Sequence, residues 1–473
     1  MNAGVLCNDV HSRLNAVTVS SIHRPASTDE VAAIVRDAAA NGECISICGA
    51  RHAMGGQQFG ERALLIDTTG LTDVSSLDTA GGTVEAGAGI AWPELVAALH
   101  ALQPDDPAPW TIRQKQTGAD ELTLGGSLAA NIHGRGLAMR PIIDDVEAFT
   151  LVDAHGRTLR CDRRQNRELF RLAIGGYGCF GIITSIRLRL ARRHALVRSV
   201  SVITLDELMP SFDERIRAGA SFGDFQFSID EASGDFLHKG IFSTYLPLPP
   251  DADAMDHLQS GETAPWGELI HLAHTDRTKC FDVYAGYYLR TDGKSYASDT
   301  HQMSFYQDGY HETLDRNLRA SCPGTEMISE LYVPRERLAA FMAQAAEALR
   351  KTGSIVIYGT IRLITADTES FLPWAARDYA CIIFNLHTDH CAEGIDRSKR
   401  SFRALIDIAL SMGGSYYLTY HRWATREQLL AAHPAFPDFM ARKSFHDPHH
   451  RFQSEWWRHH HAMIEGPEKI PDE

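Results

Sequence analysis

The chain has 473 residues, of which 44% are apolar and 22% are charged, and its formal net charge at pH 7 is −14. The length is too great for one ordinary core and predicts a globular protein with two lobes. The acidic balance, without a concentrated basic surface, excludes nucleic-acid binding as the main activity. The nine cysteines follow no framework spacing and indicate reduced thiols in a cytoplasmic protein. Because no apolar run is long enough to span a bilayer, we expect no transmembrane segment.

A capped helix opens the ordered part of the chain. Ser27 to Glu30 has the Ser-x-x-Glu form of a capping box, and apolar residues then follow on one helical face until Asn41-Gly42. Further apolar segments at 63–66 and 83–86 predict strands, and 92–102 predicts a helix. Several of these strands are not separated by a helix, so a purely parallel sheet is not expected.

Residues 44–57 join a short apolar run to a glycine-rich turn. This pattern predicts a buried strand whose following loop presents backbone N–H groups to an anion, for which a phosphate is the natural ligand. The Gly-x-Gly-x-x-Gly spacing of a Rossmann turn is absent, because His52 and Met54 stand where that motif needs small residues. We therefore expect a nucleotide site of another kind.

Residues 122–134 form a second block, rich in Gly, Ala and Ser. Small side chains at 125–127, 129 and 130 allow close approach of a large flat ligand, with Asn131 and His133 at its edge. The alternative interpretation is a tightly packed helix.

The next segments alternate strands and turns. Residues 146–152 and 158–161 predict a hairpin, and a helix is expected at 166–172. A glycine-rich stretch at 175–181 then precedes a strand at 182–190, in which apolar residues alternate with polar ones.

Four segments follow one another in this order: the capped helix that starts at Ser27, the loop at 44–57, the small-residue block at 122–134 and the glycine-rich stretch with its strand at 175–190. Together they resemble the FAD-binding domain of the vanillyl-alcohol oxidase / p-cresol methylhydroxylase (PCMH) superfamily over residues 20–195. The resemblance implies an α+β fold with two lobes: a PCMH-type FAD-binding domain and an antiparallel-sheet substrate (cap) domain. It also implies FAD-binding residues. They are Gly49, Ala50, Arg51, His52, Ala53, Met54, Gly55 and Gln57 at the pyrophosphate, Gly118, Thr123, Leu124, Gly125, Gly126, Ala129, Asn131 and His133 at the ribityl chain and ring, and Ile182 and Ile183 nearby.

His52 stands where many members of the superfamily carry the histidine bonded to the flavin 8α-methyl group. A neutral imidazole is a competent nucleophile at pH 7, so a covalent 8α-histidyl bond is expected. The alternative is that His52 only hydrogen-bonds the cofactor. No cysteine motif for a second covalent link is present.

Residues 196–425 follow a different sequence pattern. Alternating runs predict antiparallel strands at 280–289, 354–364 and 379–387, and helices are expected between them at 335–349 and 401–412. In the superfamily this region resembles the cap, a sheet over the flavin. A surface loop is expected at 247–263. The predicted boundaries are 1–195 for the FAD-binding domain, 196–425 for the cap and 426–473 for a segment that returns to the FAD-binding domain.

The stretch 413–422, with the following His433-Pro434 and Asp447-Pro448, is similar to decaprenylphosphoryl-ribose oxidases and sugar-lactone oxidases. In those families the strand after the paired glycines directs two polar residues at the flavin. Tyr417 and Tyr420 occupy their places, with Tyr420 replacing a lysine and His421 beside it, and these three are the candidate catalytic residues. The alternative is that the tyrosines pack the sheet. Histidines at 446–450 and 459–461 lack carboxylate or cysteine partners at ligand spacing, so no metal is expected.

The resulting hypothesis is an FAD-dependent oxidase or dehydrogenase that transfers a hydride from a CH–OH group of a small organic or sugar-like substrate to flavin N5. Oxygen or another acceptor would reoxidise the flavin. Two alternatives remain open: a non-covalent FAD reductase or dehydrogenase acting on a sterol-like or prenyl substrate, and a catalytically silent flavin-fold binding protein.

Overall fold

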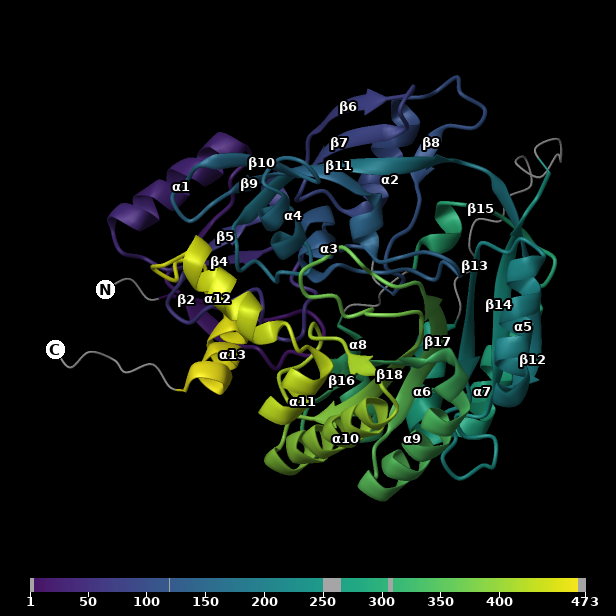
Figure 1. Cartoon of the computed structure of the whole chain (residues 1–473). Helices are drawn as coiled ribbons and strands as arrows, with labels where there is room; N and C mark the ends of the chain where they lie inside the picture. The colour runs from purple at the N-terminus through teal and green to yellow at the C-terminus, as the bar shows by residue number, and fades with distance from the viewer. Residues whose placement is uncertain (1–3, 119, 250–264, 305–308, 467–473) are drawn as a thin grey trace.

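The computed structural model describes residues 4–118, 120–249, 265–304 and 309–466 and combines helices with four sheets (Figure 1). Most strand pairs are antiparallel, so the expected α+β class is confirmed. Most of the surface loop expected at 247–263 lies outside the described residues. In the part of the chain that is described, no helix is long and apolar enough to cross a membrane.

A small parallel sheet carries the glycine-rich loop. Its strand order is β3 (Ser21–His23), β5 (Leu64–Asp67) and β4 (Ile45–Cys48). Helix α1 (Thr28–Ala40) precedes β4, and the Ser27 hydroxyl accepts a hydrogen bond from the Glu30 N–H at 3.2 Å. The Glu30 carboxylate accepts from the Ala26 N–H, one residue before the expected partner. A separate antiparallel pair, β1 (Val5–Cys7) and β2 (Val17–Val19), lies upstream.

The larger sheet of the N-terminal lobe is antiparallel and includes the predicted hairpin. Its strands are β6 (Val74–Asp78), β7 (Thr83–Gly87), β8 (Trp110–Ile112), β9 (Val146–Val152), β10 (Thr158–Asp162) and β11 (Ile182–Arg192). Burial alternates along β11, as the sequence predicts. The helices of this lobe after α1 are α2 (Trp92–Ala101), α3 (Leu124–Ala130) and α4 (Arg167–Ala173).

An eight-stranded antiparallel sheet dominates the second lobe. Its order is β15 (Ser295–Ala297), β12 (Ala195–Thr204), β14 (Lys239–Pro247), β13 (Phe222–Phe227), β17 (Val356–Ile364), β18 (Tyr379–Asp389), β16 (Gly324–Pro334) and β19 (Ser415–Tyr416). Its helices are α5 (Leu205–Arg217), α6 (Trp266–Thr275), α7 (Arg277–Leu289), α8 (Tyr310–Leu318), α9 (Leu338–Thr352) and α10 (Ala392–Ser411). Helices α9 and α10 pack on each other and on β16.

The strand predicted at 280–289 is wrong, because this segment is helix α7. Its β-branched and aromatic residues favour a strand locally. The Asp276 side chain, however, caps the helix by accepting from the Lys279 N–H, and the buried residues Cys280, Tyr284 and Tyr288 recur at helical spacing. The helix predicted at 401–412 begins nine residues earlier than expected, at Ala392.

The strand expected after the paired glycines is short and consists of Ser415–Tyr416. The Tyr417 N–H still donates to the Glu330 carbonyl at 3.0 Å, but the chain then turns toward the glycine-rich loop. There the Gln57 side-chain amide donates to the Thr419 carbonyl at 2.6 Å. Tyr417 and Tyr420 therefore lie outside the strand, so the positions of their side chains do not follow strand alternation.

The C-terminal helices are α11 (Arg426–Ala432), α12 (Phe436–His446) and α13 (Glu455–Glu465), and the last two lie beside the N-terminal lobe (Figure 1). Ile45 of β4 forms a parallel bridge with Phe452, and the Arg451 guanidinium donates to the Ala38 and Glu43 carbonyls. Phe452 is part of a small apolar cluster with α1, while the main apolar core extends through both lobes. The proposed boundary near residue 195 falls between β11 and β12.

Candidate active site

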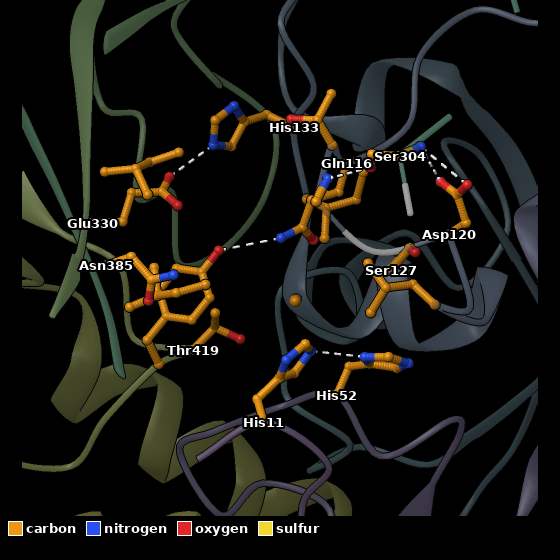
Figure 2. A pocket seen from close by; sticks show the side chains of 18 of the residues that line it. His11, His52, Gln116, Asp120, Ser127, His133, Ser304, Glu330, Asn385 and Thr419 are labelled. Carbon is orange, nitrogen blue, oxygen red and sulfur yellow. Dashed lines mark hydrogen bonds and ion pairs between the residues drawn. The ribbon is translucent and has the colours of Figure 1, made fainter. Parts of the chain in front are cut away.

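A cavity of about 1060 Å³ lies between the glycine-rich loop, helix α3 and the eight-stranded sheet. A pocket for one drug-sized ligand has roughly 300–1,000 Å³, so this cavity has room for a large ligand. Figure 2 shows Glu330 and Asn385 on one side of it and Ser127 and Asp120 on the other, with His11 and His52 together below. The glycine-rich loop, the small-residue block and the cap sheet therefore share one site.

The loop that follows β4 is held in a fixed conformation. Arg51 has a positive φ of 63°, which is uncommon for a residue other than glycine. Gly56 has a φ of 77°, and a Cβ there would lie 3.0 Å from the Arg422 guanidinium. The Asn15 side chain donates to the Met54 carbonyl at 2.7 Å, across 39 residues of sequence. These contacts fix the loop that lines one end of the cavity.

His52 and His11 form a hydrogen-bonded pair on the cavity wall. His52 Nδ1 lies 2.7 Å from His11 Nε2, and the ring centroids are 4.8 Å apart. Burial, together with the proximity of His52 and His311, lowers the pKa of His11 to about 3. His11 is therefore neutral at pH 7 and carries one N–H donor and one acceptor nitrogen.

Helix α3 presents a face of small residues to the same cavity. The Thr123 hydroxyl caps the helix by accepting from the Gly126 N–H, and a Cβ at Gly49 would lie only 2.2 Å from that hydroxyl oxygen. Glycine at position 49 therefore lets the end of β4 approach the start of α3. At Gly126 an added Cβ would meet one neighbouring atom within 4 Å, the Thr123 hydroxyl, so this face of the helix is open.

The residues present fit a dinucleotide cofactor. Gln57 Oε1 and Thr117 Oγ1 are buried at the cavity and form no hydrogen bond with the residues that the structure describes. Buried polar atoms are normally satisfied, so these two indicate a polar ligand beside the glycine-rich loop. Together with the open helix face, they match a ligand that combines a flat ring with phosphate and hydroxyl groups.

A buried carboxylate, Glu330, forms the polar centre of the opposite wall. Its Oε1 lies 2.7 Å from His133 Nε2 and also accepts from the Tyr332 hydroxyl at 2.5 Å and from the Cys381 thiol at 3.3 Å. All three donors contact Oε1, so Oε2 is the oxygen that can accept from a ligand. Burial opposes ionisation, but the charge and hydrogen bonds of His133 and the Tyr332 hydroxyl hold the pKa of Glu330 below its usual value.

His133 connects this carboxylate to the block that contains α3. Its Nδ1 lies 2.9 Å from the Gly134 carbonyl, while Nε2 faces Glu330. Both ring nitrogens thus face oxygen acceptors, so the ring donates from both when it is protonated. The pair therefore places an imidazole ring and a carboxylate side by side in the cavity (Figure 2).

Tyr420 faces the cavity, whereas Tyr417 and His421 do not line it. The Tyr420 hydroxyl accepts from the Gln116 side chain at 3.2 Å, and burial together with Glu330 raises the pKa of Tyr420 well above its usual value. Tyr417 donates to the Ala130 carbonyl at 2.6 Å. His421 packs against Phe402, and burial lowers the pKa of His421 to about 3.

Arg362 contributes a buried cation to the cavity wall. The residue is 6% exposed, and its guanidinium forms no hydrogen bond or ion pair with the other described residues. Thr360 Oγ1 and Asn385 Oδ1, on the same face of neighbouring strands, are also buried without a partner. An unpaired buried charge is costly, so this group of side chains indicates a polar or anionic ligand.

A second buried cation is already paired. Lys115 is fully buried, with its Nζ 2.7 Å from the Asp120 carboxylate and 2.7 Å from the Gln116 carbonyl. Burial lowers the pKa of Lys115, although Asp120 opposes the shift. This pair fixes the segment that carries Gln116 and hence the partner of Tyr420.

The structure brings most of the predicted FAD-binding residues to the cavity. Those that line it are Gly49, Ala50, Arg51, His52, Ala53, Met54, Gln57, Gly118, Thr123, Gly125, Gly126, Ala129, His133 and Ile183. Those outside the lining are Gly55, Leu124, Asn131 and Ile182. Asn131 turns the chain after α3 with a φ of 50° and donates to Asp367 at 2.9 Å. Ile182 and Ile183 alternate on β11, so one faces the cavity and the other the core.

Several cavity residues were not predicted from the sequence, above all Glu330, Arg362, Asn385 and His11. Glu330 precedes the apolar residues Leu331 to Val333 in β16, and a carboxylate beside such a run was the available signal, because charged residues are rarely fully buried without a role. The C-terminal histidines do not line the cavity. His446 lies 3.3 Å from Glu168, and His460 Nδ1 lies 2.7 Å from the Trp456 carbonyl.

Comparison with known proteins gives the nature of the first lobe. Residues 19–162 match the family described as FAD binding domain. The chain is 25% identical to the L-gulono-1,4-lactone dehydrogenase of Mycobacterium tuberculosis over 443 residues, which are 93% of this chain and 95% of that protein.

Two further relatives match over shorter stretches. The chain is 26% identical to an uncharacterized oxidoreductase of the fasciation locus of Rhodococcoides fascians, over 52% of this chain and 55% of that protein. It is 29% identical to cytokinin dehydrogenase 9 of Oryza sativa, over 40% of this chain and 36% of that protein. The chain thus spans only about a third to a half of the length of these two relatives. With the geometry above, these matches show that residues 19–162 are similar to an FAD-binding domain, which fits the PCMH-type fold, and that the chain is similar to proteins named as dehydrogenases and oxidoreductases.

Proposed function

We propose that this protein is an FAD-dependent oxidase or dehydrogenase that oxidises a CH–OH group of a small, polar, sugar-like substrate. The observation that carries the proposal is the Glu330–His133 pair, which faces the small-residue face of α3 across one cavity. The full-length similarity to a protein named as a lactone dehydrogenase supports a donor rich in oxygen atoms. Bound FAD would supply the chemistry that the side chains lack, acceptance of a hydride from carbon.

Glu330 is the proposed acceptor of the hydroxyl proton. Its lowered pKa means that it is ionised at pH 7, and the His133, Tyr332 and Cys381 donors contact Oε1 and not Oε2. Tyr420 suits this task less well, because its raised pKa keeps the phenol protonated. We assign Tyr420 to hydrogen-bond the substrate oxygen, with Gln116 holding its hydroxyl. His421 lies outside the lining and acts, in this scheme, as a packing residue.

Arg362, with Thr360 and Asn385, is the proposed binding site for other oxygen atoms of the substrate. These three side chains project from neighbouring strands into the cavity and have unsatisfied polar atoms. A guanidinium binds carboxylate, hydroxyl or carbonyl oxygens through several donors at once. The donor would therefore carry oxygen atoms beyond the carbon that is oxidised, which disfavours a sterol-like or prenyl substrate.

His52 is the proposed attachment point of FAD. If His52 Nδ1 donates its proton to His11 Nε2, the lone pair of His52 lies on Nε2, the nucleophilic nitrogen. His52 would hold FAD through a carbon–nitrogen bond from Nε2 to the 8α-methyl carbon. Formation of this bond would release one methyl proton and two electrons, and oxygen or another acceptor would take up the electrons. His11 acts through His52 and is a positioning residue.

The experiment that tests this function has two parts. Acid precipitation of the purified protein should leave a yellow pellet, and His52→Ala should release its flavin into the supernatant while remaining folded. A screen of lactones, polyols, hydroxy acids, sterols and prenyl alcohols, with an oxygen electrode and with a dye acceptor, should then identify a CH–OH donor. Release of intact flavin from the wild type would disprove the covalent bond, and the absence of oxidation with every donor would favour the silent flavin-binding protein.

A further inference from the structure

A second polar cluster lies in the second lobe, centred on Glu326 of β16. Three histidines from separate elements surround its carboxylate: His274 on α6, His311 on α8 and His387 on β18. The side chains of all four residues are at most 9% exposed. Glu326 and His311 also line the large cavity, so the cluster can be reached from it.

The two carboxylate oxygens have different surroundings. Oε1 lies 3.3 Å from His387 Nδ1 and 3.7 Å from His274 Nε2. Oε2 lies 3.1 Å from His311 Nδ1 and also accepts a short hydrogen bond from the Tyr310 hydroxyl. His274 Nε2 is the informative atom, because it is buried and forms no hydrogen bond with any other described residue. Its distance from Oε1 is too long for a hydrogen bond.

The two distances from Oε1, 3.3 and 3.7 Å, are close to the spacing of ligands around one metal ion. Zinc bonds to nitrogen and oxygen are about 2.0–2.2 Å long, which places the ligand atoms of a tetrahedral site roughly 3.3–3.6 Å from one another. The three atoms His274 Nε2, Glu326 Oε1 and His387 Nδ1 all lie within 4.8 Å of one another. We propose that these three residues bind a divalent first-row metal ion, for which zinc is the best fit. The FAD-binding lobe does not depend on this site.

The surroundings resemble the outer shell of a metal site. His387 turns Nδ1 toward the cluster and Nε2 toward the Asp389 carboxylate, 3.3 Å away. Asp389 is in turn paired with Arg397 of α10. A carboxylate on the far nitrogen of a histidine ligand fixes its tautomer and orientation. The Tyr310 hydroxyl, which donates to Oε2, orients the Glu326 carboxylate, and His311 Nδ1 lies 3.1 Å from the same oxygen.

The proposed ion would join the wall of the cavity to the sheet. His274 is on α6, whose residues Trp266, Leu269 and Ile270 line the cavity, while Glu326 and His387 are on adjacent strands of the sheet. The ion would therefore hold α6 against β16 and β18 and have a structural role. The competing interpretation is a hydrogen-bonded cluster that contains a protonated histidine, without a metal.

Metal content of the full-length protein, prepared without a histidine tag, tests the proposal. We expect about one zinc per chain after purification without chelator, and cobalt added to chelator-treated protein should give the visible absorption bands of a four-coordinate site. Glu326→Gln and His274→Asn should each lose at least ten-fold in zinc content. The control His271→Asn changes an exposed histidine on the same helix and should retain the wild-type content.

Two results would overturn the proposed metal site. A wild-type protein that contains no metal and shows no cobalt bands when titrated would overturn the proposal, as would cluster variants that bind cobalt like the wild type. If a cluster variant fails to fold, the comparison rests on the wild-type titration and on the shift of its unfolding temperature with added zinc, which should be positive. None of these readouts involves the flavin, so the proposed oxidoreductase function can fail while the metal site stands, and the reverse.

Discussion

Replacement of Glu330 by glutamine tests the proposed proton acceptor. The change keeps the size of the side chain and an oxygen that can still accept from the His133 ring and the Tyr332 hydroxyl, but it removes the charge. A hydrogen bond to a charged group contributes about 1.5–3 kcal/mol, so we expect a loss of folding free energy of that order and a folded protein. The flavin should remain bound, because Glu330 lies on β16, outside the glycine-rich loop.

The rate of flavin reduction should respond far more strongly than stability. Loss of a general base slows proton transfer by roughly 10²–10⁴-fold, which corresponds to about 2.7–5.4 kcal/mol in activation free energy. Anaerobic stopped-flow absorbance with the donor found in the screen measures this rate directly. Ser329→Ala, on the same strand but outside the cavity lining, is the matched control and should reduce at the wild-type rate.

Two results would refute the assignment of Glu330. The first is a Glu330→Gln rate within about three-fold of wild type, since a general base contributes roughly 10²-fold or more. The second is an equal slowing in Ser329→Ala, which would point to distortion of the strand.

Three further predictions concern Arg362, Tyr420 and two buried histidines. Arg362→Gln should raise KM for oxygen-rich donors by roughly ten-fold, about 1.4 kcal/mol, and an unchanged KM would remove Arg362 from the binding site. Tyr420→Phe should slow flavin reduction by no more than about ten-fold, because one neutral hydrogen bond contributes about 0.5–1.5 kcal/mol, and a loss of 10²-fold or more would restore Tyr420 as the proton acceptor. Burial lowers the pKa of His433 to about 4 and that of His460 to about 3, below the unfolded value near ~6.5, so stability is present above pH 6.5 and is lost as pH falls. At pH 5 each of these histidines should lower the free energy of unfolding by about 2 kcal/mol. A series of unfolding temperatures against pH measures this loss. A flat profile between pH 7 and 5 would contradict their burial as neutral rings.

The local signals in the N-terminal lobe predicted its structure well. The capped helix at Ser27, the strand at 45–48 and the hairpin at 146–162 each follow from side-chain periodicity and turn residues that act over a few positions. The small-residue block at 123–133 satisfies both interpretations considered for it, because it is a packed helix and also lines the cavity. A helix face with few side-chain atoms can serve both purposes at once.

The cap was harder to predict, because its structure depends on contacts that are distant in sequence. Helix α7 carries residues with strand propensity, and capping together with burial against the sheet overrides that propensity. The partners of Glu330 are His133, 197 residues earlier, and Cys381, 51 residues later, so no local pattern reveals the cluster. The C-terminal turn after Tyr416 likewise depends on Gln57, 362 residues from its partner Thr419.

The most direct test of the central claim is anaerobic reduction of the bound flavin by a CH–OH donor. The purified protein is mixed, without oxygen, with lactones, polyols and hydroxy acids, and the flavin absorbance is followed; dithionite serves as the positive control for reduction. The account predicts stoichiometric bleaching by at least one oxygen-rich alcohol or lactone, and recovery of the colour when oxygen or a dye acceptor is admitted. A protein that carries no flavin, or a flavin that dithionite reduces and none of these donors does, would contradict it.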